Sequence, residues 1–478
     1  MRDRLALAWR LLAGLLARGN VIGRERFGET VDLAWPRIVT GFAIMSKRTV
    51  DLAIVGVAVG GGAVAGLTVA NAYWTVGKLA FIGLAGGTLS LVSQNYGGGD
   101  TDRAAEVAGV SLLVALVLAV PVTALFGFGA RPLVGVVGGG PMTTRFGALY
   151  LSVVAPGLLF EGLNLVASRT YAGVGDTRTP MAVRAGGALL NVALSGGLVF
   201  GAGLGVFGAA LGTTLSTAAV TGVFAWGLTG RSYLGRGASP VPVGPGLRPA
   251  IGLVRQLAAV SAPLAARRVG QGLAVFPLLW IAGFFGPAVL AAVGVGRQVR
   301  DLLNAFAWGF SIAASTLVGQ ALGAAEEGLA ALYGREIIKL SLVVYLCAAA
   351  VVLVAARPIA TVFVDRDVGV TAAFVRIAAL SVVPLGIDGS ATGALRGAGD
   401  TRVPFLATLA GLYLVALPVA VLGTVTSLGV LALQAALLAE TGVPMVVNLL
   451  RFRTGTWKAI SREFRPEQEA DPDPDLGD

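Results

Sequence analysis

The chain has no histidine and one cysteine among its 478 residues, and each shortage removes a class of chemistry. Histidine usually supplies the protonation switch near neutral pH, and it is the commonest metal ligand. The lone Cys347 lies in an apolar run and excludes an internal disulfide. No phosphate-binding loop and no metal-ligand spacing stand out either. We therefore expect a protein that is not an enzyme and holds no cofactor.

Charged residues are also scarce. They make up 13% of the chain, against roughly 25% in soluble domains, whereas 55% of the residues are hydrophobic and the mean hydropathy is +0.80. Apolar runs of about 20 residues recur along the whole length, as transmembrane helices require. Segments of alternating apolar and polar residues, which would indicate a membrane β-barrel, are not evident. The composition predicts an all-α membrane protein.

Twelve apolar segments are long enough to span a membrane, six on each side of a polar stretch rich in proline and glycine. The first six lie at about 33–59, 63–95, 104–130, 145–171, 180–201 and 205–229. The second six lie at about 251–283, 287–322, 329–355, 370–396, 404–425 and 428–451. We expect five units in chain order: an N-terminal cytoplasmic segment (1–32), an N-lobe (33–229), a linker (230–250), a C-lobe (251–451) and a disordered cytoplasmic tail (452–478).

The net charge of +10 comes from arginines clustered at the ends of these spans, so we do not expect a nucleic-acid partner. Arginines are dense before the first span, in the linker and after the last span, which is typical of cytoplasmic regions. An even number of spans puts these three regions on one side, with both termini in the cytoplasm. Arg10 and Arg18 interrupt the apolar N-terminus, which favours a surface helix over a signal peptide. We expect the cytoplasmic membrane of a prokaryote.

The two halves repeat the same motifs in the same order. The segment GVGDTRTP at 173–180 returns as GAGDTRVP at 397–404, and SLVSQ at 90–94 is echoed by TLVGQ at 316–320. Pro36 in the first span likewise matches Pro263 in the seventh. Duplicated halves are typical of secondary transporters, and six spans in each half place the pseudo-twofold axis along the membrane normal. An ion channel is disfavoured because no filter-like repeat is present.

The two GDTR loops follow the fourth and tenth spans. Their glycines permit a tight turn, Asp-Thr can cap the next helix, and proline suits the first turn of that helix. We therefore expect hinge and cap residues in both copies: Gly173, Gly175, Asp176, Thr177, Pro180, Gly397, Gly399, Asp400, Thr401 and Pro404.

These motifs resemble the MATE family, the multidrug and toxic-compound extrusion transporters. The family ends its fourth and tenth spans with an Arg-x-x-Gly-x-Gly-Asp-Thr-Arg/Lys-x-Pro type loop, which the segment LRGAGDTR at 395–402 fits. The first copy departs from it, with Tyr171-Ala172 in place of Leu-Arg. The segment Ser93-Gln94-x-x-Gly97 and its repeat also fit. The resemblance covers about residues 30–450.

The resemblance implies a monomeric antiporter of two six-helix lobes around a central cleft that opens alternately to either face. An inward gradient of Na⁺ or H⁺ would drive export of organic, cationic and amphipathic solutes. The partners are then a small organic solute and the membrane lipids, and no metal beyond a possible Na⁺ is implied. The sequence does not distinguish Na⁺ from H⁺ and does not name the solute.

Asp51 is the first candidate for binding the coupling ion, because a charge inside a membrane span is costly and is therefore a functional candidate. Its equivalent in the second half is Leu278, which suggests that only one lobe performs this task. The resemblance matches Asp51 to the first-span aspartate of the archaeal and DinF-like branch. An ion pair with Lys47 or Arg48 on the same helix face is the structural alternative.

The resemblance also matches Asn191 to an asparagine of the family's fifth span and Thr213 to a threonine of its sixth. The family's second aspartate falls at Ser195, so this chain departs from the pattern at one carboxylate. Asn191 could instead join two helices, and Thr213 could bond the carbonyl four residues before it. A Na⁺ site would then have fewer charges or would recruit another acid.

Two other acids are candidates. Glu161, near the middle of the fourth span, could supply the carboxylate missing at Ser195, or it could pair with Arg184. Asp388 lies in the tenth span, about one turn from an aspartate of the other branch, and marks a possible C-lobe site. Two neighbouring acids would suit a proton carrier.

A flippase for lipid-linked oligosaccharides or peptidoglycan precursors, from the same superfamily, is the alternative function. Cationic residues in and near the spans would suit lipid phosphates, namely Lys47, Arg48, Lys78, Arg267, Arg268 and Arg297. Twelve spans and the paired GDTR loops favour the MATE interpretation.

Overall fold

The structure of the protein is a computed structural model that describes residues 11–59, 61–137, 140–232, 239–244, 250–363 and 367–463. Within these ranges the chain forms helices and no strand. A helix satisfies its backbone hydrogen bonds internally, which a lipid environment demands of a spanning segment. The all-α prediction is confirmed.

A short helix over residues 11–18 precedes the bundle. The N-terminal half then contains α2 (Arg24–Val59), α3 (Gly61–Gly77), α4 (Leu79–Gly97), α5 (Thr101–Phe128), α6 (Ala130–Val137), α7 (Gly140–Gly173), α8 (Arg178–Gly196), the π-helix η1 (Gly197–Gly201) and α9 (Gly205–Leu228). The C-terminal half contains α10 (Ile251–Phe284), α11 (Pro287–Gly323), α12 (Glu327–Phe363), α13 (Val368–Gly397), α14 (Arg402–Leu409), the π-helix η2 (Ala410–Ala416), α15 (Leu417–Val425), α16 (Val430–Thr454) and α17 (Trp457–Arg462).

Among the described residues, ten helical segments are long and apolar enough to cross a membrane. The other two expected spans, the first and the seventh, are α2 and α10, which are 36 and 34 residues long but carry charges and internal prolines. Their addition gives the twelve helices expected. Because α2 and α10 are equivalent in the repeat, the same position in each half holds a long helix with charges and internal prolines.

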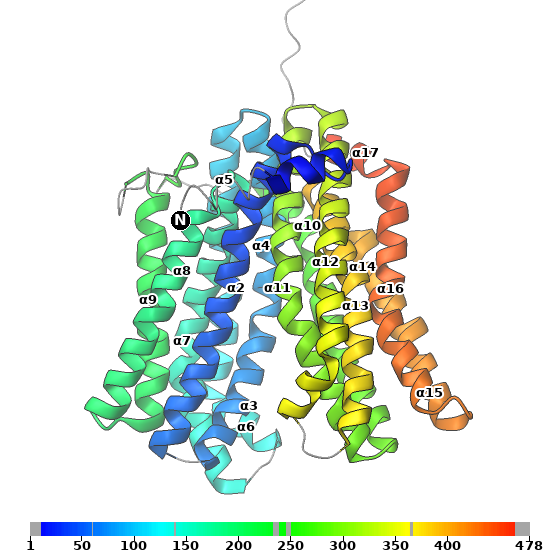
Figure 1. The fold of residues 1–478 in the computed structure, drawn as a ribbon. Helices are drawn as coiled ribbons and strands as arrows, with labels where there is room; N and C mark the ends of the chain where they lie inside the picture. The colour runs from blue at the N-terminus through cyan, green and yellow to red at the C-terminus, as the bar shows by residue number, and fades with distance from the viewer. Residues whose placement is uncertain are drawn as a thin grey trace, which may run out of the picture.

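The two halves stand side by side, with α2–α9 in one and α10–α16 in the other (Figure 1). They pack together towards the end that carries α17 and diverge towards the opposite end. At the packed end, a Cβ on Gly97 would collide with the backbone of Gln320, and one on Gly323 would collide with the backbone of Gln94. The second-span motif and its repeat thus form one symmetric contact. Only glycine permits so close an approach of α4 to α11.

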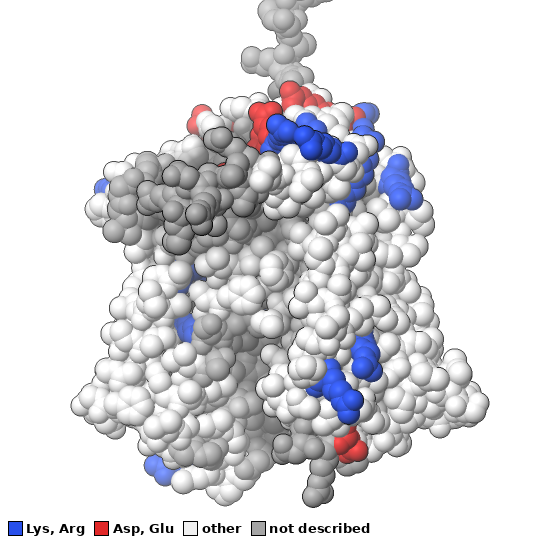
Figure 2. All heavy atoms as spheres, viewed as in Figure 1, with Lys and Arg blue, Asp and Glu red and all other residues white. Residues whose placement is uncertain are grey.

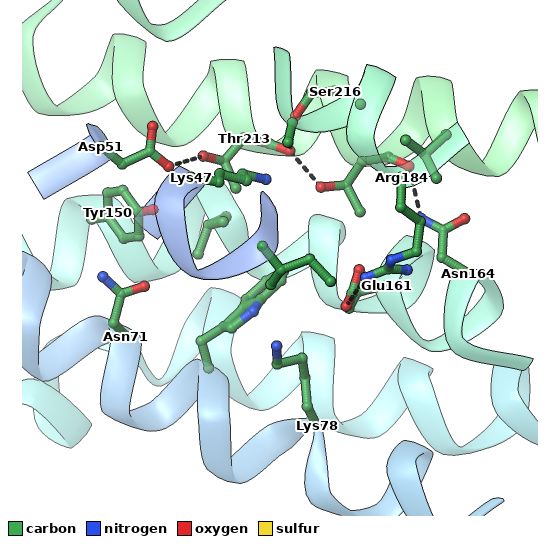
Figure 3. Close-up of a pocket in the computed structure, with 17 residues that line it drawn as sticks. Lys47, Asp51, Asn71, Lys78, Tyr150, Glu161, Asn164, Arg184, Thr213 and Ser216 are labelled. Atoms are coloured by element: carbon green, nitrogen blue, oxygen red, sulfur yellow. Dashed lines mark hydrogen bonds and ion pairs between the residues drawn. The ribbon is translucent and has the colours of Figure 1, made fainter. Parts of the chain in front are cut away.

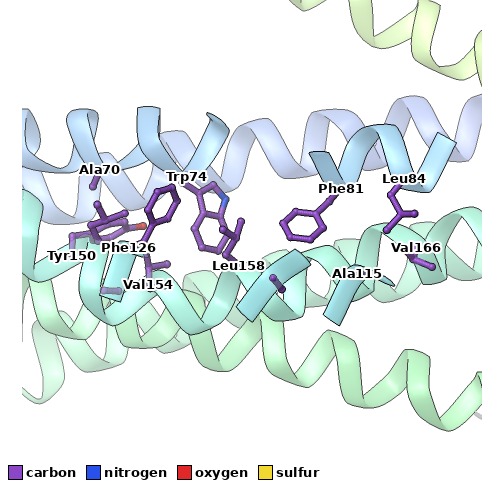
Figure 4. Packing of buried hydrophobic residues seen from close by; sticks show 14 of the residues in the cluster. Ala70, Trp74, Phe81, Leu84, Ala115, Phe126, Tyr150, Val154, Leu158 and Val166 are labelled. Atoms are coloured by element: carbon purple, nitrogen blue, oxygen red, sulfur yellow. The ribbon is translucent and has the colours of Figure 1, made fainter. Parts of the chain in front are cut away.

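Aromatic side chains fix the interior of the N-terminal half. Trp74, Phe81 and Tyr150 are buried together with Leu158 between α3, α4 and α7 (Figure 4). A Cβ on Gly162 would lie 2.9 Å from the ring of Phe81, so this glycine lets α7 approach α4 closely. This close packing fixes the position of α7, which lines the cavity described below.

The GDTR loops are tight turns that tie the helices of each half together. Gly175 and Gly399 have φ angles of +93° and +83°, a region that favours glycine. The Thr177 hydroxyl donates to the backbone carbonyl of Asp32 in α2, and Thr401 donates to that of Val260 in α10. Each loop is therefore fastened to the equivalent helix of its own half.

The aspartates of the two loops make different contacts. Asp176 accepts from the backbone N–H of Thr179 at 2.9 Å, as a capping residue does. Asp400 is buried and forms an ion pair with Arg451 Nε at 2.7 Å. The sequence predicted a capping aspartate in both loops. Asp176 caps its helix, whereas Asp400 forms an ion pair instead.

Both ends of the bundle extend beyond the expected bounds. Helix α2 begins at Arg24 instead of about residue 33, because Arg26 pairs with Glu336 of α12 at 2.6 Å and Glu29 accepts from Tyr333. These partners make polar turns stable where the sequence indicated a separate cytoplasmic segment.

The first part of the tail is also folded, contrary to the disorder expected from residue 452. Helix α16 runs to Thr454, and α17 buries Trp457 against Phe452 with ring centroids 5.2 Å apart. A buried stacked pair of aromatic rings orders this segment. Residues 464–478 of the expected tail lie outside the described residues.

Part of the linker packs against the N-terminal half. Val241 is buried, and the backbone N–H of Val243 donates to Leu228 at 2.7 Å. Residues 233–238 and 245–249 of the linker lie outside the described ranges. On the face drawn in Figure 2, most of the flank is uncharged and Lys and Arg gather mainly at the α17 end.

Candidate functional site

Asp51 of α2, Asn191 and Ser195 of α8 and Thr213 of α9 meet inside the N-terminal half, and Figure 3 shows the contact between Asp51 and Thr213. Asp51 is 4% exposed, and the other three are buried as well. Thr213 Oγ1 lies 3.2 Å from Asp51 Oδ2 and can donate to it. The structure thus brings together the four positions of the resemblance from three helices. We call this set the Asp51 cluster.

The close approach of α8 and α9 follows from local sequence. Asn191 and Ser195 are four residues apart and share one face of α8. A Cβ on Gly212 would lie 2.7 Å from Ser195 Oγ, so glycine leaves room for the serine. Directly after Gly196 the chain widens into the π-helix η1, a feature that often accompanies functional sites.

The Asn191 amide is assigned from its neighbours. With its nitrogen towards Asp51, it donates to Oδ1 at 3.1 Å, and its oxygen accepts from the backbone N–H of Thr213 at 3.3 Å. The reverse orientation would put the amide oxygen against the carboxylate. Ser195 Oγ lies 3.5 Å from the carbonyl oxygen of Ala209, which it can reach as a donor.

The Asp51 cluster offers one carboxylate and several neutral oxygens. Such a set can accept a proton or a monovalent cation, because hard cations prefer oxygen ligands. No group of three histidine, cysteine, aspartate or glutamate side chains suited to a metal ion occurs among the residues that the structure describes. The arrangement does not resemble a site for a transition metal.

A cavity of about 690 Å³ adjoins the Asp51 cluster. Its polar lining includes Lys47, Asp51, Asn71, Lys78, Tyr150, Glu161 and Arg184, and Figure 3 shows these side chains around one space. Glu161 forms an ion pair with Arg184 at 2.7 Å, with both side chains largely buried. Glu161 was considered either as a substitute for the carboxylate missing at Ser195 or as a partner of Arg184. In the structure it is paired with Arg184.

Asp388 belongs to a second polar cluster in the C-terminal half. It pairs with Arg267 of α10 at 2.7 Å and accepts from Asn448 of α16 at 2.7 Å. Arg267 also donates to Thr408 at 2.7 Å, and Thr392 lies 3.3 Å from the Asp388 carboxylate. The carboxylate is thus neutralised by an arginine.

Sequence reasoning did not single out Arg37 of α2 or treat Arg169 of α7 as a site residue. Both line a further cavity between the halves, together with Arg184. The available signal was the position of Arg37 directly after the repeated Pro36, inside an expected span, where a charge is costly. The same reasoning that selects Asp51 would have selected it.

Comparisons with known proteins agree with this architecture. The MatE family model matches residues 36–195 and again 263–422, so each half matches separately and both matches begin at the repeated prolines. The chain is 31% identical over 447 residues to a probable multidrug resistance protein NorM of Deinococcus radiodurans, covering 89% of this chain and 95% of the relative.

A second relative is the probable multidrug resistance protein NorM of Bradyrhizobium diazoefficiens, which is 28% identical and covers 90% of this chain and 93% of its own. Among solved structures, an outward-facing multidrug resistance MATE family transporter of the MOP superfamily superposes with a TM-score of 0.83. It covers 90% of this chain and 96% of its own at 20% identity, which supports the fold. The chain therefore belongs to the MATE family of membrane transporters, as its repeated motifs predicted.

Proposed function

We propose that this protein is a cation-coupled antiporter that exports organic solutes by alternating access, with Asp51 binding the coupling ion. The observation that carries the proposal is the buried Asp51 carboxylate, surrounded by Asn191, Ser195 and Thr213 and matched by an apolar Leu278 in the other half. A buried carboxylate is costly there even with Lys47 on the wall of the same cavity, so a proton or Na⁺ is expected to bind it.

Ion binding can drive transport only if the ion binds the two arrangements of the protein with different affinity. The geometry of α2 offers a physical link. It carries Asp51 towards one end, and towards the other it packs on α11 of the opposite half, where Gly309 lies against Ala34. A change at Asp51 that shifts α2 against α8 and α9 would therefore act on the contact between the halves.

We further propose that residues 33–229 and 251–451 move as two lobes of a monomer. With both termini in the cytoplasm of a bacterium, the packed end faces the cytoplasm and the diverging end faces outwards. Asp51, Asn191 and Thr213 support a place in the archaeal and DinF-like branch. They are compatible with either Na⁺ or H⁺ as the coupling ion.

The NorM relatives are named multidrug resistance proteins, which supports small organic solutes as the cargo of this chain. The resemblance implies cationic, amphipathic solutes. The matches to MATE transporters over both halves do not favour the flippase alternative.

The first test measures ion binding without any solute. Trp74 lines the cavity next to Asp51, so its fluorescence is expected to change as Na⁺ or H⁺ binds to the purified protein. Asp51→Asn should abolish the response, whereas Asp102→Asn, an exposed residue at the start of α5, should leave it intact. A response that persists in Asp51→Asn would remove Asp51 from the mechanism.

The second test measures transport in proteoliposomes, with Na⁺ and pH gradients imposed separately and with both a cationic and an anionic fluorescent solute. Uptake that is driven by one gradient and lost in Asp51→Asn would support antiport and identify the ion. Uptake of a solute at equal rates with and without either gradient would contradict coupling.

A further inference from the structure

Six arginines from five helices gather at the boundary between the two halves. Arg37, Arg169 and Arg184 line one cavity at this boundary, and Arg267, Arg268 and Arg396 line a second. A Cβ on Gly86 of α4 would lie 3.6 Å from the Arg396 side chain, so the cluster reaches across the boundary. We call this set the arginine cluster: Arg37, Arg169, Arg184, Arg267, Arg268 and Arg396.

Most of these charges lack an acidic partner. Of these six arginines, only Arg184 and Arg267 form ion pairs with described residues, namely with Glu161 and Asp388 respectively. Neutral acceptors hold Arg396, which donates to the Ser311 carbonyl at 2.9 Å. A cluster built only for stability would pair its buried charges, because an unpaired charge away from water is costly. The arginine cluster is therefore short of negative charge.

Several guanidinium donors are also unused. Arg37 Nε and Nη1 and Arg184 Nη1 are buried and meet no hydrogen-bond acceptor among the described residues. The Arg37 guanidinium instead stacks on the Trp308 ring, with its Cζ 5.2 Å from the ring centroid. Buried polar atoms are nearly always hydrogen-bonded, so these donors indicate a ligand that accepts hydrogen bonds.

Two cavities give such a ligand room. One of about 430 Å³ is lined by Arg37, Arg169 and Arg184 with Thr40, Ser168 and Thr177. The other, of about 690 Å³, is lined by Arg267, Arg268 and Arg396 with Gln271 and Trp308. Arg37 of the first cavity lies over the ring of Trp308, which lines the second, so the two cavities adjoin.

We propose that the arginine cluster binds the anionic group, a carboxylate or a phosphate, of an amphipathic organic solute that this transporter exports. The inference rests on the proposed function, and it replaces the cationic solute of the family resemblance with an anionic one. Guanidinium groups present paired donors that match carboxylate and phosphate oxygens. The indole of Trp308 supplies an apolar surface for the rest of the solute.

The test compares two probes that share one aromatic body, 1-pyrenebutyrate and 1-pyrenebutyl-trimethylammonium. Binding to the purified full-length protein is measured by energy transfer from tryptophan to pyrene. The anion should bind at least tenfold more tightly than the cation. Replacing Arg37 and Arg169 together by glutamine should weaken the anion about tenfold or more, since charged hydrogen bonds are lost, and leave the cation unchanged.

Controls separate binding from folding. Arg335→Gln changes an exposed arginine of α12 and should leave both affinities unchanged. Arg169→Lys keeps the charge and should retain most of the anion affinity even if the glutamine variant folds poorly. The double glutamine variant at Arg37 and Arg169 should unfold at the same temperature as the unchanged protein, because it removes charges that have no acidic partner. A lower unfolding temperature would indicate that these arginines have a structural role.

The phosphate could also belong to a lipid, and a second arm distinguishes this source. Titrating phosphatidylglycerol into the detergent-solubilised protein should displace 1-pyrenebutyrate if a lipid headgroup is the natural anion, and should not if a soluble carboxylate is. Either result supports an anion site. Equal binding of the two probes, a preference for the cation, or indifference to the arginine variants would overturn it. If only the anion site is wrong, the fluorescence response to Na⁺ or H⁺ at Asp51 should still be seen. Loss of that response would instead contradict the proposed function.

Discussion

Replacing Gly323 by alanine should move the protein away from the arrangement in which its halves are packed at the α17 end. A Cβ at Gly323 would collide with the backbone carbonyl of Gln94, and one at Gly97 would collide with the backbone of Gln320. These are backbone atoms inside helices, which cannot turn aside as a long side chain can. Helices α4 and α11 must therefore separate to admit the methyl group.

The expected size of the effect follows from the cost of overpacking, about 1–3 kcal/mol for an added methyl group in a tight contact. If the opposite arrangement of the lobes lacks the contact, the whole cost falls on the packed one. The ratio of the two populations then changes by about 5- to 150-fold. Gly97→Ala should act similarly, and the double variant should cost less than the sum because both contacts relax when the same two helices part.

The populations of the two arrangements can be measured by double electron–electron resonance spectroscopy. Spin labels at Asp102→Cys and Arg402→Cys, both exposed and in opposite halves, would report the separation near the packed end in a Cys347→Ser background. Gly222→Ala is the control, because nothing lies within 4 Å of its added Cβ. An unchanged distance distribution at unchanged thermal stability would refute the reasoning. Lost stability without a new distance would mean that both arrangements keep the contact.

Three further variants test the cluster, the C-terminus and a turn. Ser195→Asp adds a second carboxylate beside Asp51 and should raise Na⁺ affinity about tenfold or more in the fluorescence titration; an unchanged affinity would place Ser195 away from the ion. Trp457→Ala removes a buried indole and should destabilise the protein by about 3–5 kcal/mol, seen as a lower unfolding temperature in detergent. Gly175→Ala forces a side chain to a φ of +93° at a cost of about 1–2 kcal/mol, whereas Gly186→Ala, with open space around its Cβ, should leave thermal stability intact.

The helices and their duplication were predictable because both depend on local signals. Long apolar runs require helices in lipid, and the repeated loops mark equivalent turns in each half. The start of α2 was not predictable in this way. Arg26 and Glu29 are typical of a cytoplasmic segment when taken alone, and they become helical residues of the bundle because α12 supplies Glu336 and Tyr333.

Some residues of the candidate site could likewise be selected from the sequence, and others could not. The cost of burying a charge was enough to select Asp51 from the sequence, whereas Asn191 and Thr213 were selected only through the family resemblance. The sequence left Glu161 between two roles, since the partner of a membrane residue depends on how neighbouring helices are rotated about their axes. The ion pair with Arg184 is a consequence of that rotation.

The sequence by itself determined that this protein lies in a membrane, that it has twelve spans in two related halves, and that it carries acids where charge is costly. Each of these follows from composition, span length and repetition, which are properties of the chain alone. Only the tertiary structure decided which charges are neutralised. It pairs Asp388 with Arg267 and leaves Arg37 and Arg169 without an acidic partner among the described residues. The reason is physical: electrostatic energy depends on distances of a few ångströms between side chains from different helices, and only the packing of those helices fixes such distances.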